Sequence, residues 1–152
     1  MRVGFMKRII CIGNRYLPED AAGYEVYRFL SKRGLPNGVD LIDGGLAGLD
    51  LLQYLEGMER VVIIDSISGF GANGDIRMFS AVEVAKAADP RFDHAAGLPY
   101  LLSVLPEVCD GTVPEIWVLG IEGIPDMEAV RSVAAQALDA VRGETANEVY
   151  GK

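Results

Sequence analysis

The stretch that decides the fold reads Arg60-Val61-Val62-Ile63-Ile64-Asp65, in which four consecutive β-branched aliphatic residues stand between an arginine and an aspartate. Side chains branched at Cβ favour strands, and an unbroken apolar run predicts a strand that is buried on both faces. Shorter runs of the same kind recur along the chain, separated by segments with helical spacing of apolar residues. This alternation predicts an α/β fold: a single three-layer domain with a mostly parallel, mixed sheet of about five strands and helices on both faces.

Four further segments complete the predicted sheet: residues 8–12, 39–42, 75–80 and 115–121. The segment 75–80 follows the glycine-rich turn 69–74 closely enough to pair with residues 60–65 as a hairpin, which would make the sheet mixed. Apolar stripes predict covering helices over residues 23–32, 46–55, 98–105 and about 125–142. Pro106 is expected to end the third of these helices, because proline cannot continue the helical hydrogen-bond pattern.

The composition is that of one compact soluble domain, with 152 residues of which 50% are hydrophobic and 24% charged. The net charge of −8 opposes binding to nucleic-acid phosphates. The two distant cysteines, Cys11 and Cys109, fit reduced thiols. No apolar run approaches the roughly 18 to 20 residues of a membrane span, and none near the N-terminus is long enough for a signal peptide. We therefore expect a cytoplasmic monomer with one domain over residues 1–152, frayed at 1–6 and 144–152, that binds neither nucleic acid nor membrane.

Polar residues follow two of the predicted strands, where open α/β sheets bind their ligands. The segment after the first strand carries Glu19 and Asp20 just before a helix, and Asp65 ends the third strand. If these strands are parallel neighbours, Asp20 and Asp65 project at the same edge of the sheet. The loop that carries the only histidine, His94, can return to that edge, so these three side chains form the candidate site.

Each of these residues also has a purely structural interpretation. Glu19 and Asp20 can cap a helix, Asp65 can stabilise a turn, and His94 can be a surface residue. Taken together, two carboxylates and one imidazole suit a divalent transition ion such as Zn, Ni or Mn and leave positions open for water or substrate. Without metal, the two carboxylates could work as a general acid and base, one of them with a raised pKa. The chain contains no GxGxxG, P-loop, GxSxG or HExxH motif, which argues against the functions that those motifs mark.

Several short blocks along the chain resemble one known family in their order and approximate spacing. They are Ile12-Gly13-Asn14, Glu19-Asp20 with Gly23, Asp43-Gly44-Gly45-Leu46-Ala47-Gly48-Leu49, the strand that ends at Asp65, and His94. Over about residues 8–121 this pattern is similar to that of the hydrogenase maturation proteases. The chain departs from the family at Ala21 and Leu46, and Gly120-Ile121-Glu122-Gly123 stands where the family often has Gly-Ile-x-Pro.

The resemblance implies an aspartyl-type endopeptidase. Such a protease removes the C-terminal extension of a [NiFe]-hydrogenase large-subunit precursor after nickel insertion. The resemblance places both catalysis and nickel contact on Asp20, Asp65 and His94. These are the same three residues that form the candidate site predicted from the strand ends. The nickel would be carried by the substrate, and the isolated protein could hold another divalent metal. Two other functions stay open: a chaperone that holds the nickel-loaded subunit without cutting it, and a metal-independent small α/β hydrolase with Asp65 as its base.

Overall fold

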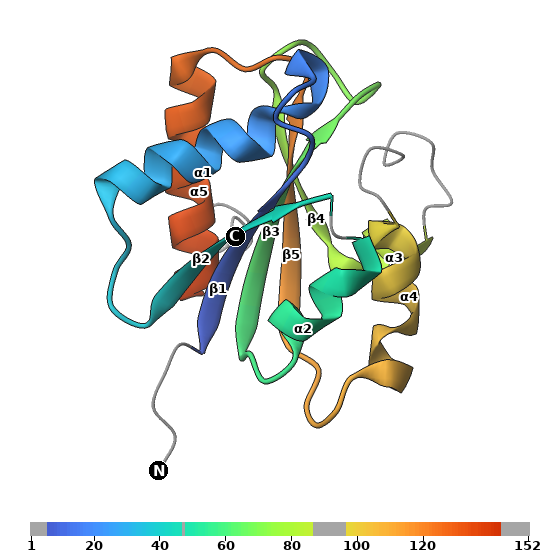
Figure 1. Cartoon of the computed structure of the whole chain (residues 1–152). Coiled ribbons are helices and arrows are strands. Elements are labelled where there is room, and N and C mark those ends of the chain that lie inside the picture. The colour runs from blue at the N-terminus through green and yellow to red at the C-terminus, as the bar shows by residue number, and fades with distance from the viewer. Residues whose placement is uncertain (1–5, 47, 87–96, 144–152) are drawn as a thin grey trace, which may run out of the picture.

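The computed structural model describes residues 6–46, 48–86 and 97–143 (Figure 1). Within these residues, five strands form one sheet in the order β2-β1-β3-β5-β4, in which only β4 is antiparallel to its neighbour. The strands are β1 (Lys7–Ile12), β2 (Val39–Gly45), β3 (Arg60–Ile67), β4 (Ile76–Ser80) and β5 (Glu115–Glu122). The predicted α/β class and the mostly parallel, mixed sheet are confirmed.

Helices cover both faces of this sheet. One face carries α1 (Ala22–Arg33) and α5 (Met127–Arg142); the other carries α2 (Leu52–Leu55), α3 (Ala81–Lys86) and α4 (Leu98–Val108) (Figure 1). Two short 3-10 turns, η1 (Pro18–Asp20) and η2 (Gly48–Leu51), precede α1 and α2. The sheet therefore lies between two helical layers, as the alternation of strand and helix patterns predicts.

The central strand β3 is buried on both faces, as its apolar run predicts. Val62 and Ile64 pack with residues of α1 and α5, whereas Val61 and Ile63 pack with residues of α2, α3 and α4. The sheet thus separates two apolar cores, and each helical layer is held by its own core. In the part of the chain that the structure describes, no helix is both long and apolar enough to cross a membrane.

The predicted hairpin between residues 60–65 and 75–80 is wrong. Strand β4 pairs instead with β5, with Ile76 opposite Ile121 and Ser80 opposite Trp117, so that β5 lies between β3 and β4. The physical reason is burial: β5 is almost wholly buried beyond its first residue and needs a neighbour on each side, whereas β4 is partly exposed along its length. A partly exposed strand is tolerated best at the edge of a sheet.

Three helical details also differ from the prediction. The helix expected over residues 46–55 is divided into η2 and α2, and α4 continues past Pro106 to Val108. Pro106 lies in the last turn, where only one backbone hydrogen bond is lost. Helix α3 was not predicted, although its start is a capping box: Ser80 Oγ accepts from Glu83 N at 3.1 Å, and Glu83 Oε1 accepts from Ser80 N at 2.7 Å.

Helix α5 begins with a side-chain cap, which supports a first testable prediction. Asp126 Oδ1 accepts a hydrogen bond from Ala129 N at 2.8 Å. Loss of such a cap costs about 1 kcal/mol, which in a chain of this size lowers Tm by roughly 2–4 °C. We expect Asp126→Ala to show this loss by calorimetry and Asp126→Asn to retain most of the stability, because asparagine caps almost as well. Equal Tm values for the two variants would contradict the capping role.

Candidate functional site

The two predicted acids, Asp20 and Asp65, lie at the edge of the sheet where the parallel strands have their C-terminal ends, called here the carboxyl edge. Strands β1 and β3 are parallel neighbours, with Ile10 opposite Ile63, so both end at the same edge. Figure 1 shows η1, which carries Asp20, at this end of the molecule. Asp20 is 3% exposed and Asp65 is 0% exposed. The prediction that parallel strands bring these two carboxylates to one edge is confirmed.

Asp65 lies inside β3 and not in a turn. It lies on the same face of the strand as Ile63 and Ile67, which belong to the core under α2, α3 and α4, so its carboxyl group points into that layer. Its Oδ1 accepts from Ser66 N at 2.8 Å. Among the described residues, its Oδ2 has no hydrogen-bond partner. A fully buried carboxyl oxygen in this state is costly to the fold and is a common property of ligand sites.

The side chain of Asp20 is bonded to the loop before it and does not cap the helix after it. Its Oδ2 accepts from Asn14 N at 3.0 Å, and its backbone N–H donates to Leu17 O at 2.8 Å. The N-cap position of α1 belongs to Ala21, which makes no side-chain capping bond. The capping interpretation of Asp20 is therefore wrong.

Two glycines of the sequence pattern allow this arrangement through close contact. Gly13 has a φ of +137°, and a Cβ there would meet the carbonyl oxygen of Asp20. A Cβ at Gly23 would meet the carbonyl oxygen of Ile12 and lie 3.0 Å from Ile12 N. The end of β1 therefore lies directly against η1 and the first turn of α1, and this contact places Asp20 over the edge.

The two acids interact electrostatically. Burial raises the pKa of Asp65 well above its ordinary value of 3.8; the hydrogen bond from Ser66 N opposes this rise, and the charge of Asp20 adds to it. A carboxyl pair of this kind favours a shared proton or a bound cation over two bare negative charges. Chemically, the pair can hold a divalent metal ion or supply one protonated and one ionised carboxyl group for hydrolysis.

The segment around Asp43 strengthens the loop beside the acids. Asp43 Oδ1 accepts from Gly45 N at 3.2 Å, and its Oδ2 lies 3.8 Å from Arg15 Nη2. The guanidinium of Arg15 also lies 4.5 Å from the ring centroid of Tyr24 on α1. The backbone of Gly13 donates to Gly45 O at 2.9 Å, which connects the loop after β1 with the end of β2. Asp43 thus fixes loop geometry near the site.

One further buried acid at this edge, Glu122, is not among the predicted site residues. The buried polar residues of the described chain are Asp20, Asp65, Ser66 and Glu122. Glu122 is the last residue of β5 and is 8% exposed. An acid directly after a buried apolar run is the same signal that identified Asp65, and it could have identified Glu122 as well.

The predicted third member of the site, His94, lies outside the described residues, as does Asp93 beside it. In the described ranges, no group of three histidine, cysteine, aspartate or glutamate side chains is arranged to hold a metal ion. The contribution of His94 to the site therefore stays a prediction.

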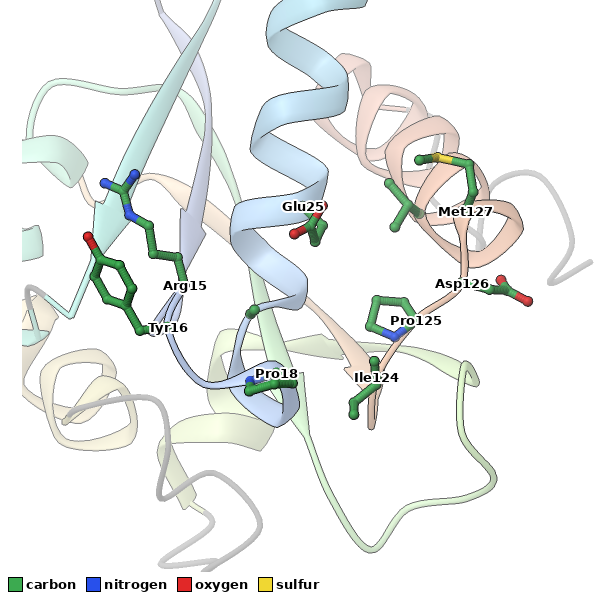
Figure 2. Close-up of a pocket in the computed structure, with 10 residues that line it drawn as sticks. Arg15, Tyr16, Pro18, Glu25, Ile124, Pro125, Asp126 and Met127 are labelled. Carbon is green, nitrogen blue, oxygen red and sulfur yellow. The ribbon is translucent and has the colours of Figure 1, made fainter.

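A cavity of about 320 Å³ opens on the face of the sheet that α1 and α5 cover, between α1 and the connection from β5 to α5. Figure 2 shows Pro18, Glu25 and Pro125 around this space. Neither Asp20 nor Asp65 is among the described residues that line it. The short turn η1 contributes to both places, because Pro18 lines the cavity and Asp20 belongs to the acid pair.

Comparisons with known proteins support the family resemblance that the sequence motifs indicate. The sequence model of the hydrogenase maturation protease family matches residues 24–142. A protein of Methanocaldococcus jannaschii named for this family is 28% identical over 147 residues, covering 90% of this chain and 94% of that protein. The structure is similar to that of the hydrogenase maturating endopeptidase HybD from Escherichia coli, with a TM-score of 0.66, 25% identity and 88% of each chain covered.

A second solved structure agrees: the [NiFe] hydrogenase maturation protease HybD from Thermococcus kodakarensis, with a TM-score of 0.60 and 26% identity, covering 89% of this chain and 95% of that one. The family match over residues 24–142 covers most of the chain and includes Asp65. The chain therefore belongs to the hydrogenase maturation protease family and is a peptidase.

Proposed function

We propose that this protease removes the C-terminal extension of a [NiFe]-hydrogenase large-subunit precursor after nickel has been inserted, with Asp20, Asp65 and His94 as the groups that contact the nickel. The observation that carries the proposal is the pair of buried carboxylates at the carboxyl edge, one of them with a raised pKa. A cation brought to this pair removes the cost of its charge, so the site favours a substrate that already holds a metal ion.

The chain's own residues then have distinct roles. Asp65 is held rigidly in β3, and Asp20 is held by Asn14 N, so the two carboxylates keep their positions without substrate. Oxygen ligands of this kind complete the shell of a divalent ion and leave its other ligands to the precursor. Cleavage that depends on these contacts would wait for nickel loading. We further propose that the protein acts as a monomer in the cytoplasm, where the precursor would be matured.

The decisive experiment compares two forms of a hydrogenase large-subunit precursor, one loaded with nickel and one prepared without it. Each is mixed with the purified protease and analysed by intact-mass spectrometry. We expect loss of a C-terminal peptide from the nickel-loaded form alone. The difference in rate should be at least about 10²-fold, as expected when contacts that orient the substrate are missing.

The other outcomes separate the alternatives. Stable complex formation with an unchanged precursor mass would favour the chaperone function. Equal cleavage of both forms would contradict nickel sensing while leaving the protease activity intact. If the precursor is neither cut nor bound, the proposed substrate is wrong, and assays of small esters and amides would test the metal-independent hydrolase.

A further inference from the structure

Glu122 stands at the same edge and on the same face of the sheet as Asp65. In the parallel pair of β3 and β5, Asp65 lies opposite Gly120, and Ile67 lies opposite Glu122. Side chains of paired residues in neighbouring parallel strands point to the same face. The Glu122 carboxylate therefore lies one pleat beyond Asp65, where β3 leaves the sheet and enters the loop of residues 68–75.

This carboxylate is surrounded by backbone donors of that loop. Glu122 Oε2 accepts from Gly69 N at 2.9 Å, and its Oε1 accepts from Phe70 N at 3.0 Å and Gly71 N at 3.1 Å. Three consecutive N–H groups that converge on one anion form a backbone nest, which usually binds a phosphate or another external anion. Here a side chain of the protein fills it, so the loop is folded around Glu122.

Other contacts complete the attachment of the loop. The rings of Phe70 and Phe79 lie with centroids 5.1 Å apart, and Arg77 Nη2 donates to Phe70 O at 3.0 Å. The backbone of Glu122 accepts from Gly74 N at 2.8 Å and donates to Asp75 O at 2.8 Å. Both ends of the loop therefore depend on the same residue, its first part through the side chain and its last part through the backbone.

We propose that Glu122 is a positioning residue of the protease: it holds the segment 69–71 as a fixed wall beside Asp65, against which the peptide to be cut is aligned. The inference rests on the proposed function, because it takes the acid pair as the place of cleavage. A buried carboxylate is a costly way to stabilise a loop, since its desolvation must be offset by strong hydrogen bonds. The buried Glu122 carboxylate therefore indicates that a fixed position of residues 69–71 is required for function and is not explained by stability alone.

Two variants test the role. Glu122→Gln keeps the shape but places an N–H₂ group opposite one or two backbone N–H groups, and Glu122→Ala removes both acceptor oxygens and so all three hydrogen bonds. The matched control is Glu115→Gln, at the opposite end of the same strand, where the half-exposed side chain of Glu115 pairs with Arg60 at 2.9 Å. Cleavage kinetics of the nickel-loaded precursor and amide hydrogen exchange of residues 69–71 are measured for each protein.

We expect faster exchange at residues 69–71 and a KM raised about tenfold in Glu122→Gln and more in Glu122→Ala, with kcat per folded molecule changed much less. Glu115→Gln should leave both readouts unchanged. A merely structural role would lower the amount of folded enzyme at unchanged KM. Loosened loop amides with an unchanged KM would therefore overturn the proposal. If the wild-type protein itself leaves the precursor uncut, the proposed function fails instead, and a KM effect on any substrate identified later would decide the role of Glu122.

Discussion

Replacing Asp65 by asparagine is expected to stabilise the protein at neutral pH while removing its activity. Asparagine has nearly the shape of aspartate and can keep the hydrogen bond from Ser66 N, which Asp65 Oδ1 accepts at 2.8 Å. It cannot ionise, so it avoids the burial of a charge and the repulsion from Asp20 that raise the pKa of Asp65. The proteolytic rate should fall by at least about 10³-fold, since an amide is neither a general base nor a strong ligand for a divalent ion.

The pH dependence of this effect has a definite sign. The pKa of Asp65 is higher in the folded protein than in the unfolded chain, so the folded state binds the proton more tightly. Stability from this group is therefore fully present below its ordinary pKa of 3.8 and is lost as the pH rises towards the folded value. The stability advantage of Asp65→Asn should be small in acid, grow with pH, and level off above the folded pKa.

Unfolding of metal-free protein between acidic and neutral pH measures this difference. Each 1 kcal/mol of gain raises Tm by roughly 2–4 °C in a chain of this size. Asp110→Asn serves as the control, because Asp110 is exposed and its replacement removes the same charge from the surface. A gap between Asp65→Asn and wild type that does not depend on pH would show that Asp65 is not held as a desolvated acid.

Most strands and helices of this fold could be predicted from the sequence, because each depends on the spacing of apolar residues within a short segment. The apolar run before Asp65 identifies a strand that is buried on both faces, and the parallel pairing of such strands then places Asp20 beside it. The partner of β4 could not be predicted in the same way. Residues 75–80 fit an antiparallel pairing with either β3 or β5, and the choice depends on how fully each strand is buried in the assembled sheet.

Glu122 shows a second limit of sequence reasoning. Its partner Gly69 lies 53 residues away along the chain, and each of its bonds goes to a backbone N–H group. Backbone donors carry no sequence signature of their own, so only the folded chain reveals that three of them converge on one side chain. By contrast, the two acids that the sequence did identify stand close to apolar runs in the sequence: Asp65 directly follows one inside β3, and Asp20 follows β1 through one short loop.

The second large effect is expected at Gly23, which is buried where α1 contacts the end of β1. Alanine is normally favoured over glycine in a helix by up to about 1 kcal/mol. Here the added Cβ would collide with the carbonyl oxygen of Ile12 and lie 3.0 Å from Ile12 N. These are backbone atoms of a central strand and cannot move aside, so overpacking that costs about 1–3 kcal/mol should outweigh the helix propensity. We expect Gly23→Ala to unfold at lower temperature than wild type, whereas Ser31→Ala, at an exposed position of α1, should not.

The same substitution tests how the helix controls the site. Asp20 ends η1, and only Ala21 separates it from α1, so a helix that moves away from β1 takes the Asp20 carboxylate with it. A misplacement of about 1 Å can cost roughly 10²-fold in rate. We therefore expect the rate of precursor cleavage per folded Gly23→Ala molecule to fall by about that factor, measured well below its Tm. If the folded variant cleaves at the wild-type rate, the Ile12 contact serves stability alone, and the loop bond from Asn14 N to Asp20 Oδ2 is sufficient to hold Asp20 in position.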